Sequence, residues 1–172
     1  MRKKYIMAIL IVGVFLLTGC RSEVEEDNGI NPDTGIRHNI PDTSEQVLEC
    51  TRDAIGDGDL TVTTNFRVYY VGSFITRMIT TRIIETTDSS RLAQEKAHYQ
   101  TLFSVYDNLA YHDTVLREER NKVIFETTID YTNINTDHLL AIEGETNNII
   151  RNGRAVLADW RDLARRAGVS CD

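Results

Sequence analysis

Apolar and polar residues alternate with a period of two over several stretches of the chain, a pattern typical of strands with one buried face. The clearest strand covers 60–71, and one of its faces carries Leu60, Val62, Phe66, Val68 and Tyr70. The same alternation predicts strands over 46–54 and 122–131, and a short strand is expected over 111–117. Residues 74–87 carry apolar side chains on both faces, which predicts a central strand. Gly72 and Ser73 predict a tight hairpin between the second and third strands, because glycine adopts the positive φ that such turns require.

A helical spacing of apolar residues predicts helices over 89–108 and 154–167, and a shorter helix over 137–143. Asp88 supplies an oxygen that can cap the first helix, and Gly168 follows the last helix as a stop. The order strand, strand, strand, helix, strand, strand, helix predicts an α+β fold. We therefore expect an antiparallel sheet of about five strands, with two to three helices packed on one face.

The N-terminus follows a different pattern. Arg2, Lys3 and Lys4 precede an uncharged apolar run over 5–17. That run fits the core of a secretory signal, and it is short for a bilayer span of roughly 20 residues. The run ends in Leu-Thr-Gly-Cys, which closes at Cys20 and resembles the lipobox of bacterial lipoproteins.

The lipobox resemblance implies that residues 1–19 are a signal peptide and that Cys20 becomes the lipidated first residue of the mature chain. The alternative is an uncleaved N-terminal anchor in which Cys20 is incidental. Under the lipoprotein interpretation the protein is held at the extracytoplasmic face of the cell membrane, and the membrane is its partner through the N-terminal lipid.

Residues 20–45 predict an acidic, flexible tether, because they begin with a carboxylate-rich run and contain both prolines of the chain. The remaining residues, 46–172, predict a single domain. The net charge of the chain is −7, and loss of the three basic residues of the leader makes it −10. Such acidity argues against a nucleic-acid partner, which requires a basic surface.

Two further cysteines, Cys50 and Cys171, lie near the start and at the end of the predicted domain. In an exported chain they are candidates for a disulfide that fixes the C-terminus. The alternative is two free buried thiols. No Cys-x-x-Cys motif is present, which argues against a thiol oxidoreductase.

Four segments of the predicted domain resemble the YehR-like bacterial lipoproteins, small single-domain proteins of unestablished function. They are 66–72 (Phe-Arg-Val-Tyr-Tyr-Val-Gly), 106–109 (Tyr-Asp-Asn-Leu), 129–131 (Ile-Asp-Tyr) and 165–171 (Arg-Arg-Ala-Gly-Val-Ser-Cys). The segment around 145–152 has no counterpart in that family. The resemblance implies an α+β fold and a lipoprotein, and it implies no known chemistry.

The chain carries no sequence motif of a hydrolase, a nucleotide-binding loop or a metal site. Its histidines lack metal-ligand spacing: His38, His98, His112 and His138. We therefore expect no metal, no cofactor and no catalysis, and a non-catalytic module that binds an envelope protein or a small ligand. The alternatives are a carrier of a small ligand or cell-wall fragment, with a pocket between sheet and helices, and an envelope hydrolase. Tyr69 beside Arg67 suggests an exposed aromatic and cationic patch, although strand propensity also explains the tyrosine.

Overall fold

The computed structural model describes residues 44–143 and 149–172, which form one antiparallel sheet and three helices. The strands are β1 (Gln46–Asp57), β2 (Leu60–Val71), β3 (Phe74–Glu85), β4 (His112–Glu119), β5 (Lys122–Asp130), β6 (Ile150–Arg151), β7 (Arg154–Val156) and β8 (Val169–Cys171). The helices are α1 (Ser89–Phe103), α2 (Thr136–Glu143) and α3 (Leu157–Arg166), and a short 3-10 turn, η1 (Ser104–Tyr106), follows α1.

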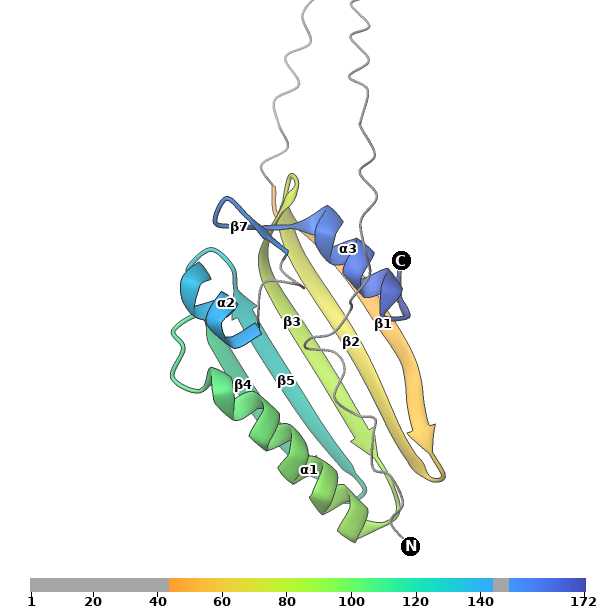
Figure 1. Ribbon diagram of the computed structural model, residues 1–172. Helices are drawn as coiled ribbons and strands as arrows, with labels where there is room; N and C mark the ends of the chain where they lie inside the picture. Colours follow the sequence, from red (N-terminus) through yellow and green to blue (C-terminus); the bar gives the residue numbers. More distant parts are fainter. Residues whose placement is uncertain (1–43, 144–148) are drawn as a thin grey trace, which may run out of the picture.

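The main sheet has the order β4-β5-β3-β2-β1-β8, and β7 extends it by pairing with β6 and with the first residues of β3. All three helices lie on one face of this sheet, which we call the helix face (Figure 1). The opposite face, which we call the open face, carries no described helix (Figure 1). Within the described ranges, no helix has both the length and the apolar character needed to cross a bilayer.

The expected sheet of about five strands in the order β-β-β-α-β-β-α is wrong. The sheet has eight strands, because β6, β7 and β8 follow β5, and α2 lies between β5 and β6. These additional strands contain only two or three residues each, too few to show alternation in the sequence. Residues 154–156, which we expected to begin the last helix, form β7 instead, and α3 begins at Leu157.

The five strands predicted from the sequence are present with small differences at their ends. The largest difference is in β1, which continues to Asp57 beyond a register irregularity between Arg52 and Ile55. The predicted hairpin at Gly72 is also present, since Val71 pairs with Phe74 and Gly72 has a φ of +59°. The sequence therefore located the long strands, where several residues repeat a pattern.

Capping explains where α1 begins. The Asp88 side chain accepts hydrogen bonds from the backbone N–H groups of Ser90 at 2.9 Å and Arg91 at 3.1 Å. These bonds satisfy donors that the first helical turn leaves free. The helix ends at Phe103, earlier than the expected residue 108, and η1 continues the chain.

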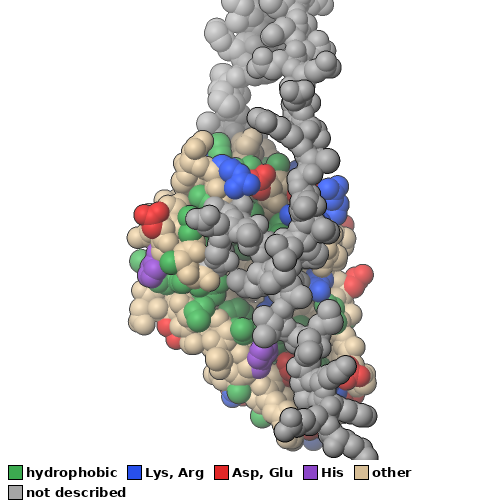
Figure 2. All heavy atoms as spheres, in the orientation of Figure 1, with side chains coloured by type: hydrophobic (Ala, Val, Ile, Leu, Met, Phe, Trp, Pro, Cys, Tyr) green, Lys and Arg blue, Asp and Glu red, His purple; other side chains and the backbone are tan. Residues whose placement is uncertain are grey.

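Apolar side chains on the helix face form two separate clusters. The first includes Val68, Leu139 and Trp160, and the Trp160 ring meets Phe66 edge-on at 5.9 Å. The second lies beneath α1 and is centred on Ile84, Val123 and Phe125. Figure 2 also shows hydrophobic side chains at the surface between α2 and the end of α1, while charged side chains of the described residues are scattered over this view. The helix face is therefore not one continuous apolar layer.

Candidate functional site

A polar band separates the two apolar clusters of the helix face. Strand register places Arg52 on β1 opposite Thr64 on β2, and Thr64 opposite Arg82 on β3. Residues paired in this way on antiparallel strands project from the same face of a sheet. We call Arg52, Thr64 and Arg82 the arginine row. In Figure 1 the middle of β2 and β3 lies between α1 and α3.

Aromatic side chains of α1 hold the Arg82 guanidinium on the helix face. Its central carbon lies 4.8 Å from the centre of the Tyr99 ring and 6.0 Å from that of Phe103. Its Nε donates a long hydrogen bond of 3.5 Å to the hydroxyl oxygen of Thr64, which is 4% exposed. Arg82 itself is half-buried. Burial is the main cause that lowers the pKa of Arg82, and the positive charge of Arg52 lowers the same pKa further.

The two arginines of the row have no neutralising partner among the described residues. None of the ion pairs between described residues includes Arg52 or Arg82. The chain as a whole carries a net charge of −7, so acidic residues are plentiful elsewhere. Withdrawing a cation from water without an ion-pair partner costs free energy, which the contacts of Arg82 with Tyr99, Phe103 and Thr64 offset only in part.

Further hydrogen-bonding groups lie beside the arginine row. Thr80 and Thr127 pair across β3 and β5, one pleat further along, and Thr127 pairs with Thr114 on β4. The Thr114 hydroxyl is buried and has no hydrogen-bond partner. The Nε2 atom of His98 on α1 is also buried without a hydrogen-bond partner. The His98 and Tyr99 ring centres are 5.3 Å apart.

Polar contacts from the first turn and the middle of α1 position the helix over the sheet. Arg91 donates from Nη1 to the backbone oxygen of Asp57 at 2.8 Å, and Lys96 pairs with Glu118 on β4 at 2.8 Å. Further along the helix, Tyr99 packs on Phe125 with ring centres 5.9 Å apart. The Tyr99 and Phe103 rings beside Arg82 are therefore held in position by contacts that α1 makes at several points along its length.

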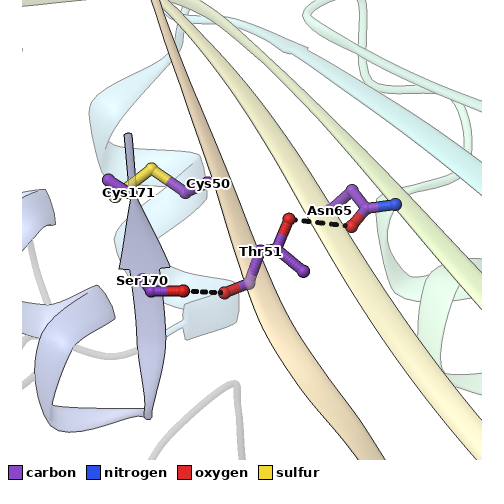
Figure 3. Close-up of a disulfide and its surroundings, with 5 residues drawn as sticks. All are labelled: Cys50, Thr51, Asn65, Ser170 and Cys171. Atoms are coloured by element: carbon purple, nitrogen blue, oxygen red, sulfur yellow. Dashed lines mark hydrogen bonds between the residues drawn. A yellow bond between two sulfur atoms is a disulfide. The ribbon is translucent and has the colours of Figure 1, made fainter.

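The disulfide expected between Cys50 and Cys171 is present and joins β1 to β8 (Figure 3). The two cysteines are register partners on these antiparallel strands. The Ser170 hydroxyl donates to the backbone oxygen of Thr51 at 3.2 Å, also drawn in Figure 3. The bridge therefore fixes β1 two residues before Arg52. Cys20, the expected lipidation site, lies outside the described residues.

The remaining sequence candidates lie apart from the row. The described part of the chain contains no group of three His, Cys, Asp or Glu residues that could hold a metal ion. The cation over the Tyr69 ring is Arg77 of β3, at 4.1 Å, rather than the expected Arg67. Tyr69 and Arg77 pair in register one residue out of phase with Val68 and Met78 of the core, so they lie on the open face.

Two surface depressions lie near the ends of the sheet. One of about 360 Å³ is lined by Asp59, Thr86 and Lys122, among others, near the β1–β2 turn. Another of about 420 Å³ is lined by Tyr70, Leu157 and residues near them. Neither contains a residue of the arginine row.

The sequence does contain a signal for the arginine row, although we did not expect this site. Arg52 follows Cys50 by two residues, and Arg82 precedes Ile84 by two, so each occupies an inward position of its strand. Thr64 likewise interrupts the inward face of the clearest predicted strand. Polar residues at inward positions are candidates for a site, but only strand register shows that these three are neighbours.

No protein-family model matches the chain, and no curated protein matches it either. Among solved structures it is similar to the NMR structure of the Escherichia coli YehR protein, with a TM-score of 0.54 and 16% identity over 75% of this chain and 91% of that chain. It is also similar to the NMR structure of a protein from Streptococcus pneumoniae, with a TM-score of 0.48 and 12% identity over 90% of this chain and 100% of that chain. The likeness to YehR shows a shared fold.

Proposed function

We propose that this chain is a membrane-anchored extracytoplasmic lipoprotein, related to the YehR-like lipoproteins, whose folded part is a non-catalytic binding module. The observation that carries the binding function is the arginine row. Two half-buried cations, Arg52 and Arg82, face the helices without an ion-pair partner among the described residues of an acidic chain.

The free-energy cost of burying the unpaired arginines supports a binding role for the row. An unpaired, half-buried guanidinium lowers the stability of the fold, whereas an apolar side chain at the same position would join the two clusters. Local rules of folding are broken in this way chiefly at functional sites. A bound partner that carries negative charge offsets the cost, so the row is suited to binding.

The N-terminal sequence supports the lipoprotein part of the proposal. The basic start, the apolar run over 5–17 and the Leu-Thr-Gly-Cys ending at Cys20 together fit export followed by lipidation. The shared fold with YehR is consistent with a relationship to the YehR-like lipoproteins. Two or three acyl chains hold a protein firmly at a membrane, because each buried methylene contributes ~0.8 kcal/mol.

Lipidation is tested by expressing the full chain in a bacterium and measuring its mass after detergent extraction. Cys20→Ala should accumulate as unprocessed, lipid-free precursor, while the neighbouring Ser22→Ala variant should mature normally. Mature, membrane-held Cys20→Ala protein of ordinary size would contradict the lipoprotein proposal.

Binding is tested by native mass spectrometry of the detergent-extracted full chain. A co-purifying mass should be present on the wild type and on Arg67→Gln, which removes a cation from the open face, and absent from Arg82→Gln. Equal loss from both variants, or retention on Arg82→Gln, would place the binding surface elsewhere and refute the proposed role of the row.

A further inference from the structure

We infer that the ligand of the arginine row is a small molecule in which a carboxylate or phosphate group is attached to an aromatic or apolar body, with the oxyanion held between Arg52 and Arg82. This inference rests on the proposed binding function and names its ligand class.

The spacing of the strands supports a shared anion. Arg52 on β1 and Arg82 on β3 are separated by β2, so their backbones are two strand spacings apart, or ~10 Å. Side chains as long as arginine can converge over that distance on a group bound above Thr64. The electrostatic effect of Arg52 on Arg82 also indicates that the two charges already interact across the row.

The donor chemistry of the row suits an oxyanion. A guanidinium offers a planar fork of N–H groups that matches the two oxygens of a carboxylate or phosphate. In Arg82, Nε contacts Thr64 at 3.5 Å, a long hydrogen bond that a better acceptor can replace. The buried, unpartnered Nε2 of His98 provides another polar group next to Tyr99.

The surroundings of the row indicate an aromatic or apolar body rather than an inorganic ion. On one side, Tyr99 and Phe103 of α1 lie against the Arg82 guanidinium. On the other, Phe66 follows Thr64 on the same face of β2 and meets Trp160 of α3 at 5.9 Å. An attached ring or alkyl group therefore has apolar surface on both sides of the anion.

Charge counting also favours a small ligand over a nucleic acid. Two arginines can neutralise one or two anionic groups, whereas binding to nucleic acid at physiological salt requires contacts to many phosphates. The net charge of −7 would repel such a polymer. The row therefore fits a molecule with a single oxyanion.

Calorimetric titration of the detergent-extracted full chain tests the ligand class, with benzoate, phenyl phosphate, inorganic phosphate and neutral benzamide as probes. Benzoate or phenyl phosphate should bind at least tenfold more tightly than benzamide and inorganic phosphate. Arg82→Gln and Arg52→Gln should each weaken this binding at least tenfold. Arg82→Lys, which keeps the charge but loses the fork, should weaken it less than Arg82→Gln, and Arg67→Gln on the open face should change it less than twofold.

The outcomes separate this inference from the proposed function. If benzamide binds as tightly as benzoate and Arg82→Gln weakens both, the oxyanion inference is overturned while the row remains a binding surface. If inorganic phosphate binds as tightly as phenyl phosphate, the inference that the ligand carries an aromatic or apolar body is overturned. If no probe binds a chain whose circular dichroism and melting are intact, the assigned ligand class is wrong, and the mass-spectrometric comparison decides the binding function independently.

Discussion

The guanidinium carbon of Arg82 lies 4.8 Å from the centre of the Tyr99 ring, so a charge on β3 is held against an aromatic face of α1. A cation–π contact contributes ~0.5–2 kcal/mol, depending on how dry the site is. The cost of withdrawing an unpaired cation from water is of order several kcal/mol per ion. The contact therefore orients Arg82 without fully compensating for its burial.

Replacing Arg82 with methionine should stabilise the fold, because the apolar methionine side chain removes an unpaired charge and joins the two apolar clusters. We expect the free energy of unfolding in urea to rise by about 1 kcal/mol. Arg67→Met, on the open face, is the matched control and should change it by less than ~0.5 kcal/mol. A loss of stability larger than ~1 kcal/mol in Arg82→Met would show that Arg82 serves the core rather than a ligand.

Reducing the Cys50–Cys171 disulfide should lower stability substantially. The bond closes a loop whose ends are 121 residues apart, and such a link restricts the unfolded chain by up to ~5 kcal/mol on the chain-entropy model. We expect a loss of ~3–5 kcal/mol, measured as a lower Tm in the presence of reductant. The double variant Cys50→Ala/Cys171→Ala should melt at the reduced value and should not respond to reductant. Equal Tm values with and without reductant in the wild type would contradict the expected stabilisation.

Asp59 should make stability depend on pH in the acid range. Hydrogen bonds from the side chains of Thr87 and Thr86 are the main causes that lower the pKa of Asp59 from 3.8 to about 2. The unfolded chain therefore takes up a proton before the folded chain does. The stabilisation is fully present above about pH 4 and is lost as the pH falls through about 2.

The Asp59→Asn variant tests this pH dependence. Its Tm should be lower than that of the wild type at pH 5 and above, and the difference should shrink toward pH 2. Asp57→Asn is the control, because the Asp57 side chain is 95% exposed and contacts Arg91 at 3.5 Å. A Tm difference between wild type and Asp59→Asn that stays constant from pH 6 to pH 2 would contradict the role of this carboxylate.

Replacing Gly153 with alanine should destabilise the β6–β7 hairpin. Gly153 has a φ of +75°, and an added Cβ would meet no atom within 4 Å, so the effect arises from the backbone conformation alone. We expect a loss of about 1 kcal/mol in the free energy of unfolding. Gly153→Asn should lose less, since asparagine tolerates positive φ. Equal stability of Gly153→Ala and the wild type would show that this hairpin contributes little to the fold.

The sequence predicted those parts of the fold that are marked by a repeated pattern or by a distinctive single residue or segment. Alternation over 60–71 located β2, Asp88 located the start of α1, and the export signal made a Cys50–Cys171 bond plausible. The strands β6 to β8 were missed because two or three residues cannot display a period. Asn152 and Gly153, which both have positive φ, form the turn between β6 and β7.

The candidate site could not be predicted in the same way. Each residue of the arginine row is a single polar interruption in its own strand, and such interruptions are common. Their meaning depends on register across β1, β2 and β3, which sequence patterns do not supply. A row of neighbours assembled from three strands is therefore visible only after the strands have been paired.

The position of the disulfide gives the domain a mechanical property. Load that enters through the N-terminal side of the chain reaches Gln46 first, and Cys50 lies only four residues further along β1. At that point the force passes through a covalent bond into β8, which is hydrogen-bonded to β1 at the edge of the sheet. Pulling from the N-terminal side can therefore separate β1 alone only over its first few residues, before Cys50. Beyond them, β1 and β8 must separate from β2 together, so the bond adds resistance where β1 carries Arg52.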